Sequence, residues 1–449
     1  MNVKNLKSRF YSECAIAFLL IFVSCQRQDK LTILGEDSSN LQAMESLKGE
    51  YERDTNVKIA FRPNTFEDAF NKANQDFAHN TGQYDIVLQL NFALSSYVRN
   101  DYVYIIDELL EMVNKQYSTS FQDNLLFQNA WKEVGWYYEN PSNPQKGEMK
   151  KIGYPFATNT MLLAYNKRMF ENPNNQEAYK AKYGENLAIP TTWEQFKNIA
   201  EFFTTSNVYG VCMQGATDGW LYYEYCNYLF GMGGSVFDKQ EKEYGWEGTR
   251  YTPITITSPE AVAATKFYKS LKPFNKGNYT TVDATEQMKL LKEGNVAMGI
   301  VWSDYLYSFD ALGKDFGFAP IPGDKSAIAG GCFYVNKDTK NPKEAIKYIM
   351  YLMQPNVQID LAKKGLCSPL RTTYDNSEVQ KIAYSNALKT SLERGVYMFE
   401  ASVESEVVSE KITNHIQRLW NNDNLKVEDI LEQIKQDIET GRNEAYNNL

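Results

Sequence analysis

Acidic and amide side chains follow short apolar segments at several places in the chain, and they could bind a polar ligand. Near the N-terminus these candidates are Glu36, Asp37, Asn64 and Asn91. An ionised carboxylate accepts hydrogen bonds from two hydroxyl groups, whereas an amide both donates and accepts. The set therefore predicts recognition of a small molecule rich in hydroxyl groups. For each residue the alternative is a helix N-cap or a solvated loop.

Two tryptophans are candidates for stacking on the same ligand. Trp302 follows an apolar run, with Asp304 two positions later, and Trp220 lies in the sequence ATDGWLYYEY. A sugar ring has apolar C–H faces that stack on an indole, and such a contact contributes about 1 kcal/mol, as aromatic pairs do. Asp304 could hold a sugar hydroxyl or cap a helix. For the tryptophans the alternative is core packing, since 14% of the chain is aromatic.

Residues for catalysis, metal binding or nucleic-acid binding are scarce. His79 and His415 are the two histidines and are far apart in the sequence, which leaves little material for a catalytic triad or a histidine-rich metal site. No spacing marks the carboxylate pair of a glycoside hydrolase. The net charge is −9, and there is no basic patch. We therefore predict a protein that is not an enzyme, needs no cofactor or metal and does not bind nucleic acid.

The cysteines beyond the N-terminal segment are scattered, at Cys212, Cys226, Cys332 and Cys367. No CxxC motif occurs, which argues against a metal site or a redox motif. Disulfides among the four stay open at this point, and buried free thiols in a large core are the favoured interpretation.

Alternating apolar patterns predict the framework that positions the N-terminal candidates. We expect strands at Leu31–Leu34, Val57–Phe61 and Tyr84–Leu88, and helices at Leu41–Tyr51 and Thr65–Ala78. This order is typical of an open, mostly parallel sheet with helices on both faces. Ligands of such sheets bind beyond the carboxyl ends of the strands, which is where the polar candidates lie.

Later helices carry their own start signals. Asn341 and Glu344, with a proline directly after the asparagine, match an N-cap and a capping box. Thr191 and Glu194 form the same pattern further upstream. The stretch 406–446 contains no proline and predicts a long helical C-terminus.

The N-terminus has the features of a targeting segment. Basic residues open it, at Lys4, Lys7 and Arg9. The apolar run Ala15–Val23 that follows is too short to span a bilayer as a helix. Ser24 then precedes Cys25, an arrangement that resembles the lipobox of bacterial lipoproteins. The resemblance implies a signal peptide over residues 1–24 and a lipid anchor on Cys25, and the alternative is ordinary secretion.

Segments along most of the remaining chain resemble the extracellular solute-binding proteins of ABC importers, family 1, the maltose-binding-protein-like sugar binders. In order along the chain they read YDIVLQLNF, IGYPFATNTMLLAYNKRMF, PTTWEQF, GGSVFD, SPEAVAATKFYKSL, EGNVAMGIVW, AGGCFYVNKDTKNPKEAIKYIMYL and KKGLCSPLR. The resemblance implies a two-lobed α/β fold of the type II periplasmic-binding-protein class. It places lobe 1 at 25–156 plus 331–374 and lobe 2 at 159–328 plus 375–449. In this family the lobes close around a ligand by hinge bending.

The resemblance also adds candidate site residues. Asn64 and Asn159 fall where a sugar binder of this family has acidic ligand contacts, so an amide replaces a carboxylate at both positions. This change argues against simple transfer of sugar specificity. Gly331, next to Gly330, allows the backbone to approach a ligand or to bend at a hinge.

The leading hypothesis is a monomeric, lipid-anchored, extracytoplasmic protein that captures a carbohydrate and delivers it to an ABC importer permease. It would be held by lipidated Cys25 in the periplasm or at the cell surface. The first alternative is a polyamine or other cationic ligand bound among aromatic and acidic side chains. The second is a surface adhesin or sensor that has no permease partner.

Overall fold

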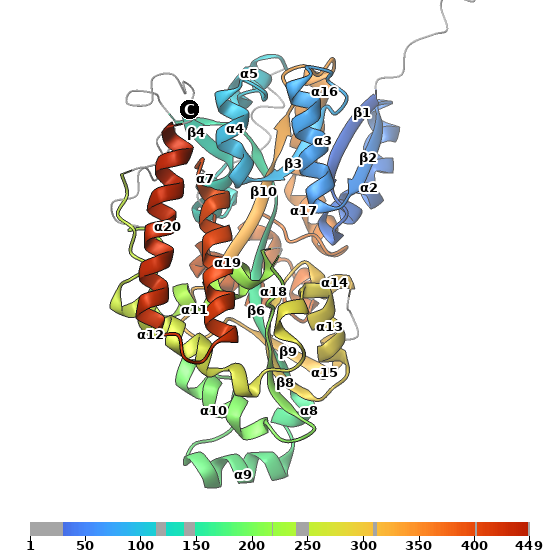
Figure 1. The fold of residues 1–449 in the computed structure, drawn as a ribbon. Helices are drawn as coiled ribbons and strands as arrows, with labels where there is room; N and C mark the ends of the chain where they lie inside the picture. Colours follow the sequence, from blue (N-terminus) through green and yellow to red (C-terminus); the bar gives the residue numbers. More distant parts are fainter. Residues whose placement is uncertain are drawn as a thin grey trace, which may run out of the picture.

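The structure is a computed structural model that describes residues 30–113, 123–138, 149–217, 219–238, 251–308, 312–399 and 402–447. The predicted signal peptide and Cys25 lie outside these residues. The described chain forms two α/β lobes, one above the other in the view of Figure 1. We call the lobe that contains β1 to β3 lobe 1 and the lobe that contains β7 to β9 lobe 2.

The main sheet follows the strand order β2-β1-β3-β10-β6-β8-β7, with β11 on β10 and β9 on β6. The strands of lobe 1 are β1 (Lys30–Glu36), β2 (Lys58–Asn64) and β3 (Ile86–Leu90), and those of lobe 2 are β7 (Tyr209–Cys212), β8 (Val296–Trp302) and β9 (Phe316–Ala319). Strand β1 is parallel to both β2 and β3, and β7 is parallel to β8. The strand–helix–strand prediction for the N-terminal region is therefore confirmed, including the order of its elements.

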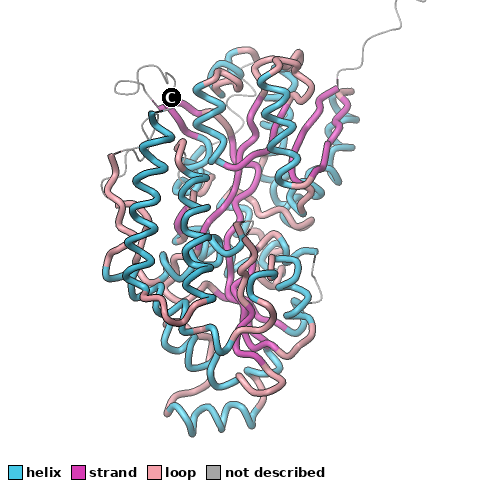
Figure 2. The backbone as a smooth tube through the Cα atoms, in the orientation of Figure 1, coloured by secondary structure: helices cyan, strands magenta, loops and turns pink. Residues whose placement is uncertain are grey.

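Two long strands join the lobes, β6 (Tyr154–Asn166) and β10 (Ala327–Val335). They pair with each other in antiparallel orientation, and β10 then borders β3 of lobe 1 while β6 borders β8 and β9 of lobe 2. Figure 2 shows these strands running between the lobes. The pairing shifts by a bulge between Gly331 and Cys332. The lobe boundaries expected near residues 156–159 and 328–331 thus fall inside continuous strands.

Helices pack around each part of the sheet (Figure 1). Those with lobe 1 are α2 (Ser39–Thr55), α3 (Phe66–Ala78), α4 (Leu94–Arg99), α5 (Ile106–Glu111), α7 (Gln128–Gly135), α16 (Pro342–Leu352) and α17 (Pro355–Ala362). Those with lobe 2 are α8 (Lys167–Phe170), α9 (Pro173–Tyr183), α10 (Trp193–Phe203), α11 (Trp220–Gly231), α12 (Pro259–Ser270), α13 (Ala284–Lys292), α14 (Tyr305–Ser308) and α15 (Leu312–Asp315).

The remaining elements are short, apart from the three C-terminal helices. They comprise the strand pair β4 (Trp136–Tyr138) and β5 (Met149–Lys151), strand β11 (Val396–Tyr397), and helices α18 (Ser385–Arg394), α19 (Ser405–Asn421) and α20 (Val427–Asn447). Short 3-10 turns lie at Asn91–Ala93, Asp123–Leu125, Lys272–Phe274, Tyr279–Thr281, Arg371–Asp375 and Val379–Lys381.

Two predicted helix starts differ from the structure in detail. Helix α10 is capped by Thr192 with Gln195 as its capping-box partner, so the predicted pair was wrong by one residue. Both members of the actual pair satisfy the first backbone N–H groups of the helix. Because Thr191 and Thr192 are chemically equal, the sequence pattern could not distinguish the two registers.

The start of α16 has the predicted N-cap position but not the predicted cap. Asn341 donates through its side chain to Asp85 Oδ1 at 3.1 Å and to the Lys30 carbonyl at 3.3 Å, so its amide ties the helix to β1. Glu344 pairs with Lys347 instead of closing a capping box. The capping-box interpretation was therefore wrong, because Asn341 bonds to distant segments and Glu344 pairs one turn further along its own helix.

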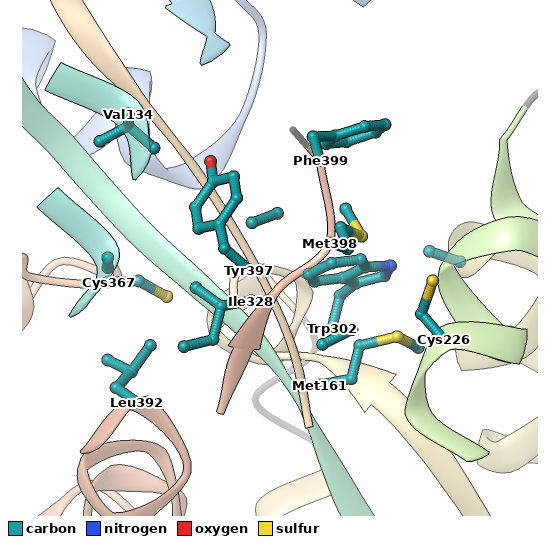
Figure 3. Close-up of a cluster of buried hydrophobic side chains, with 14 of the residues drawn as sticks. Val134, Met161, Cys226, Trp302, Ile328, Cys367, Leu392, Tyr397, Met398 and Phe399 are labelled. Carbon is teal, nitrogen blue, oxygen red and sulfur yellow. The ribbon is translucent and has the colours of Figure 1, made fainter. Parts of the chain in front are cut away.

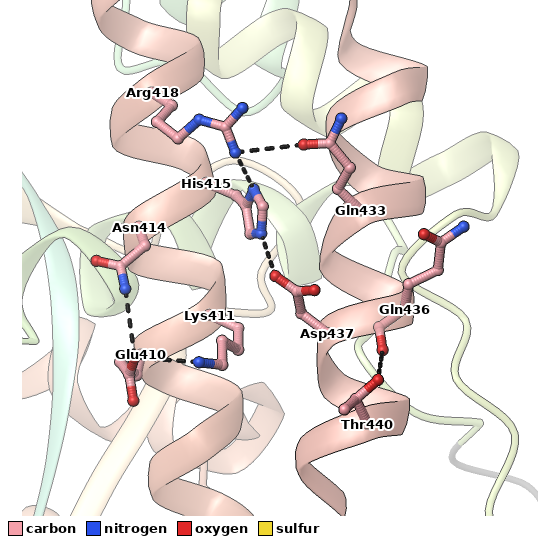
Figure 4. Close-up of polar contacts among 9 residues, drawn as sticks. All are labelled: Glu410, Lys411, Asn414, His415, Arg418, Gln433, Gln436, Asp437 and Thr440. Atoms are coloured by element: carbon pink, nitrogen blue, oxygen red, sulfur yellow. Dashed lines mark hydrogen bonds and ion pairs between the residues drawn. The ribbon is translucent and has the colours of Figure 1, made fainter.

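The predicted C-terminal helix is two helices, α19 and α20, which pack against each other. His415 lies between them, as Figure 4 shows. Its Nε2 is 2.7 Å from Asp437 Oδ2, and its Nδ1 is 2.9 Å from the Arg418 guanidinium. Arginine can only donate, so Nδ1 accepts and Nε2 carries the proton. His415 thus has a structural role in joining the two helices.

The four scattered cysteines form no disulfide with one another, and all four are buried, as the sequence favoured. Cys226 and Cys367 belong to an apolar cluster where the crossing strands meet the chain that follows α18 (Figure 3). The cluster also holds Trp302, which brings this core to the edge of the space between the lobes.

Candidate functional site

A cleft of about 410 Å³ lies between the lobes. Lobe 1 contributes Glu36, Thr65, Phe66, Glu67 and Leu90, and lobe 2 contributes Trp220, Tyr223, Trp302, Asp304 and Tyr305. The crossing strands and the chain after β11 add Asn159, Ala329 and Met398. A smaller recess of about 40 Å³ shares several of these residues and reaches Asn40, Gln89 and Gly330. The cleft has the size of a small-molecule site.

The lobe 1 wall is built by the ends of two parallel strands. The register pairs Glu36 at the end of β1 with Asn64 at the end of β2, and α3 begins directly afterwards. This arrangement brings Glu36 and Phe66 to the cleft. Asp37 is exposed and accepts a hydrogen bond from Gln42 at 3.0 Å. Of the two adjacent acidic residues, Glu36 and Asp37, only Glu36 is among the described residues that line the cleft.

Asn64 is engaged by its own lobe. Its Oδ1 accepts a hydrogen bond from Lys72, and its Nδ2 donates to the Arg62 carbonyl at 3.0 Å. Neither Asn64 nor Asp37 is among the described residues that line the cleft. Their predicted role as ligand contacts would require a ligand that extends past the cleft rim.

The lobe 2 wall is an aromatic cluster. Tyr223 packs edge-to-face on Trp220 at 5.7 Å and on Trp302 at 5.8 Å between ring centroids, and Trp220 meets Tyr305 at 6.2 Å. Edge-to-face packing fixes the rings while leaving other ring faces free to contact a ligand. Trp302 is only 5% exposed, and its Nε1 has no hydrogen-bond partner among the described residues. Both predicted tryptophans therefore line the cleft, and Trp302 is also part of the core.

A chain of hydrogen bonds crosses from lobe 1 to lobe 2 beside the cleft. The Cys367 backbone N–H donates to Asn40 Oδ1 at 2.9 Å, and Asn40 Nδ2 donates to Asn159 Oδ1 at 3.2 Å. Asn159 Nδ2 then donates to Asp304 Oδ2 at 3.1 Å. Ser39 donates to the Asp304 carbonyl at 2.7 Å. The chain fixes the orientation of the Asn159 amide and holds the two lobes in contact.

Replacing Asn40 with alanine should break this chain. The substitution leaves the buried Cys367 N–H and Asn159 Oδ1 without their partners, which should destabilise the protein by about 1–3 kcal/mol. Chemical denaturation of the mature protein would measure the loss. Ser46→Ala, on the exposed side of the same helix, should change stability by less than about 0.5 kcal/mol. Equal effects of the two substitutions would contradict the role of the chain.

The cleft is acidic. Glu36 is exposed to solvent within the cleft, and lining residues of both lobes lie around it. Burial, followed by the charges of Asp304 and Asp37, raises the pKa of Glu36 to about 7. Burial also raises the pKa of Asp304 to about 6, although backbone N–H groups oppose the shift. None of the described lining residues is lysine, arginine or histidine. Both carboxyl groups thus titrate close to neutral pH.

Two further candidates lie in the framework beside the cleft. Asn91 is fully buried, and its Nδ2 donates to the carbonyls of Glu133 at 3.0 Å and Phe399 at 3.2 Å. Gly331 lies in β10, where an added Cβ would approach the Gln89 carbonyl oxygen to 2.2 Å. Tight strand packing thus explains this glycine, while Gly330 lines the recess.

Several cleft residues were not predicted from the sequence. Tyr223 lies three positions after Trp220 on α11, and this helical spacing could have identified it. Phe66 begins the helix that follows a predicted strand end. Asn40 and Met398 carry no local signal, because only the tertiary fold brings them to the site.

Metal chemistry finds no support in the described ranges, where no group of three His, Cys, Asp or Glu side chains could hold an ion. None of the described helices combines the length and apolar character that a bilayer-spanning segment needs.

Two α/β lobes, two long crossing strands and a cleft lined from both sides define the chain as a two-lobed binding protein. A sequence profile of the bacterial extracellular solute-binding proteins matches residues 47–387. The chain therefore belongs to this family, and its extracytoplasmic location follows from that membership. A sequence comparison with curated proteins found no match.

Solved structures of two-lobed solute-binding proteins share the fold. An Agrobacterium radiobacter K84 ABC-transporter solute-binding protein in complex with ribitol superimposes with a TM-score of 0.72 at 18% identity, covering 92% of this chain and 98% of that one. Maltose-bound MalE3 of T. maritima gives a TM-score of 0.70 at 16% identity, covering 92% and 99%. A protein of Thermotoga lettingae TMO bound to α-D-tagatose gives 0.71 at 18%, covering 92% and 100%. The predicted fold is confirmed.

Proposed function

We propose that the protein captures a carbohydrate in the interlobe cleft and delivers it to the permease of an ABC importer. The observation that carries the proposal is the pairing of an aromatic wall with acidic and amide side chains in one cleft. Aromatic faces suit the C–H faces of a sugar ring, and Glu36, Asn159 and Asp304 suit its hydroxyl groups. The ligands named for the structurally similar proteins, ribitol, maltose and tagatose, support the same class.

The proposed mode of action is closure of the lobes on the ligand. The chain from Asn40 through Asn159 to Asp304 crosses between the lobes beside the cleft, so a ligand that contacts Asp304 would strengthen the closed arrangement. A ligand shifts this equilibrium only by its difference in affinity between the two arrangements. The closed form would present a distinct surface to the permease.

The ligand class can be tested with a stability panel of monosaccharides, oligosaccharides, sugar alcohols, peptides and polyamines. A bound sugar at about 100 times its dissociation constant should raise the free energy of unfolding by about 2.7 kcal/mol. Calorimetric titration would then measure affinity. A panel in which every sugar leaves stability unchanged would overturn the carbohydrate proposal.

A second candidate is a polyamine or another cationic small molecule. The absence of basic side chains among the described lining residues, beside Glu36, Glu67 and Asp304, favours it. Stabilisation by spermidine with no response to sugars would establish this alternative. A surface adhesin or sensor is a further alternative, and permease genes next to the gene for this chain would argue against it.

We also propose that the mature protein is a monomer held at the membrane by a lipid on Cys25. The apolar leader and the Ser24-Cys25 pair support this anchor. Mass spectrometry of the mature N-terminus would test it. An unmodified N-terminus at another position would show ordinary secretion.

A further inference from the structure

Carboxylates are the charged groups of the cleft. The acidic lining residues come from both lobes, with Glu36 at the end of β1, Glu67 on α3 and Asp304 directly after β8. Among the described lining residues none is basic, so the protein supplies no opposite charge there. Glu36 and Glu67 are exposed to the water of the cleft, whereas Asp304 is half-buried, and a charge that is enclosed without an opposite partner is costly to desolvate.

The hydrogen-bonding capacity of the two inner carboxylates is also unfilled. Asp304 Oδ2 accepts from Asn159, whereas Oδ1 is buried and accepts no hydrogen bond of ordinary geometry from the described residues, although the backbone N–H groups of Asp304 and Tyr305 lie near the carboxylate. The Glu36 carboxylate lies within the electrostatic reach of Asp304 and Asp37, and no hydrogen bond to it is found among the described residues, although the Glu36 carbonyl accepts from the Ser38 N–H at 2.9 Å. Trp302, nine-tenths buried, leaves its indole N–H unpartnered at the same cleft. The carboxylate oxygens of Glu36 and Asp304 and the indole N–H of Trp302 are therefore available to hydrogen-bond a ligand.

We infer that the carbohydrate bound here carries a protonated amine, and that its ammonium group lies between Glu36 and Asp304. This inference rests on the proposed function. An ammonium group has three donors and no acceptor, which matches two carboxylates that, once ionised, can only accept. A sugar hydroxyl would fill the hydrogen bonds but could not compensate the negative charge of the ionised carboxylates. The ring faces of Trp220 and Trp302 also attract a cation, so the aromatic wall serves both parts of such a ligand.

Proton release on binding should mark the ammonium contact. The titratable groups near the pair on neighbouring elements are Asp37, Glu67, Tyr223, Asp283, Tyr305 and Cys367. Burial raises the pKa of both tyrosines, so they stay neutral near pH 6. At that pH Glu36 and Asp304 are partly protonated in the free protein. A bound ammonium group favours their ionised forms and so displaces protons into the buffer.

The test uses the mature protein at pH 6 and sets of sugars that differ at one position. Amino sugars and their oligomers are compared with the N-acetylated and the hydroxyl counterparts of the same length, and spermidine is included. We expect the amine forms to bind about tenfold more tightly or better than both counterparts, as charged hydrogen bonds do. Titration in buffers of different ionisation enthalpy should detect proton release with the amine forms alone.

Variants that replace each carboxylate with an amide of the same shape test whether Glu36 and Asp304 cause the tighter binding of the amine forms. Glu36→Gln and Asp304→Asn should each weaken binding of the amine form about tenfold or more and reduce the proton release. Glu194→Gln removes an exposed charge on α10 and is the matched control, expected to leave both readouts unchanged. The comparison among ligands on the wild-type protein needs no variant and holds even where a variant fails to fold.

The outcomes separate the inference from the proposed function. Neutral sugars that bind as tightly as amine forms, with no proton release, would overturn the inference and leave carbohydrate capture standing. Binding of spermidine without any sugar, or no binding at all, would overturn both. Selective binding of amine-bearing sugars with loss in both carboxylate variants would support both.

Discussion

Replacing Trp302 with alanine should both destabilise the protein and remove much of its ligand affinity. Trp302 is 5% exposed and packs against Tyr223, so its deletion leaves a large cavity at the junction of β8 and α11. Truncation of a buried tryptophan typically costs about 3–5 kcal/mol of folding stability. Loss of ring stacking at about 1 kcal/mol, together with the indole N–H, should weaken sugar binding about tenfold or more. Denaturant unfolding and calorimetric titration measure the two effects.

Trp193 offers a matched control for the binding loss. It lies in lobe 2 with 8% exposure, and it also has an unpartnered Nε1 among the described residues, but it packs on Phe196, Tyr228 and Phe267 away from the cleft. Trp193→Ala should lose comparable stability and keep its ligand affinity below the unfolding transition. Equal losses of affinity in the two variants would show that Trp302 acts on the ligand only through stability.

Conservative replacement separates stacking from hydrogen bonding at the same position. Trp302→Phe keeps an aromatic face on Tyr223 and removes the indole N–H. If stacking carries the affinity, this variant should bind nearly as well as wild type. If the unpartnered N–H donates to the ligand, the variant should behave more like Trp302→Ala in titration.

Trp302 also shows why the sequence left two interpretations open. Its position after an apolar run fits both a ligand contact and a core residue, and the structure shows that the ring does both. The end of a buried strand is where a side chain passes from the core to the surface. Sequence spacing locates that point but does not tell how much of the ring remains accessible.

The N-terminal framework was predictable because its signals are local. Apolar runs with intervening amphipathic helices predicted the order of β1, α2, β2, α3 and β3. The carboxyl-end rule pointed to Glu36, which lines the cleft, and also to Asp37, Asn64 and Asn91, which do not line it. Asp37, one position later, is exposed and does not line the cleft, because successive side chains along an extended chain point in opposite directions. The alternation of side chains can show which of two adjacent acidic residues faces the cleft, but only once the last residue of the strand is known.

Contacts between distant segments could not be predicted in the same way. Asn40 meets Asn159 across 119 positions, and Asn341 meets Asp85 across 256 positions. Asn40 and Asn341 each lie at a helix start, where a local capping motif explains an asparagine equally well. Only the folded arrangement decides whether such an amide caps its own helix or bridges to another element.

The second large effect expected is a fall in stability with rising pH that depends on Glu224. This residue lies on α11, the helix that carries Trp220 and Tyr223, and it is completely buried. Burial raises the pKa of Glu224 to about 8, although hydrogen bonds from Tyr228, at 2.9 Å, and from the Gln214 backbone oppose the shift. The folded protein therefore holds this proton at neutral pH, whereas the unfolded chain releases it.

The sign of the effect follows from this difference in proton binding. Below the unfolded pKa of 4.5, both states are protonated and Glu224 contributes no pH dependence. Between pH 4.5 and about 8 the folded state binds more protons, so stability decreases as pH rises. The decrease approaches about 1.4 kcal/mol per pH unit, which amounts to about 3 kcal/mol between pH 5 and pH 8.

Glu224→Gln should remove this dependence, because the amide keeps an acceptor for Tyr228 and cannot ionise. At pH 5 we expect the variant to be as stable as wild type or less stable, because burying the amide N–H groups of glutamine costs more free energy than burying a neutral carboxylic acid. At pH 8 we expect it to be more stable than wild type. Denaturant unfolding at several pH values measures both curves. Glu36, Asp304 and Glu404 also have raised pKa values, so they too make stability decrease as pH rises. Their contribution is present in both proteins, and the difference between variant and wild type therefore isolates Glu224. For the control Glu194→Gln, on the exposed face of α10, the curve of stability against pH should be parallel to that of wild type. A parallel curve for Glu224→Gln would contradict the prediction, because it would show that Glu224 is already ionised in the folded protein.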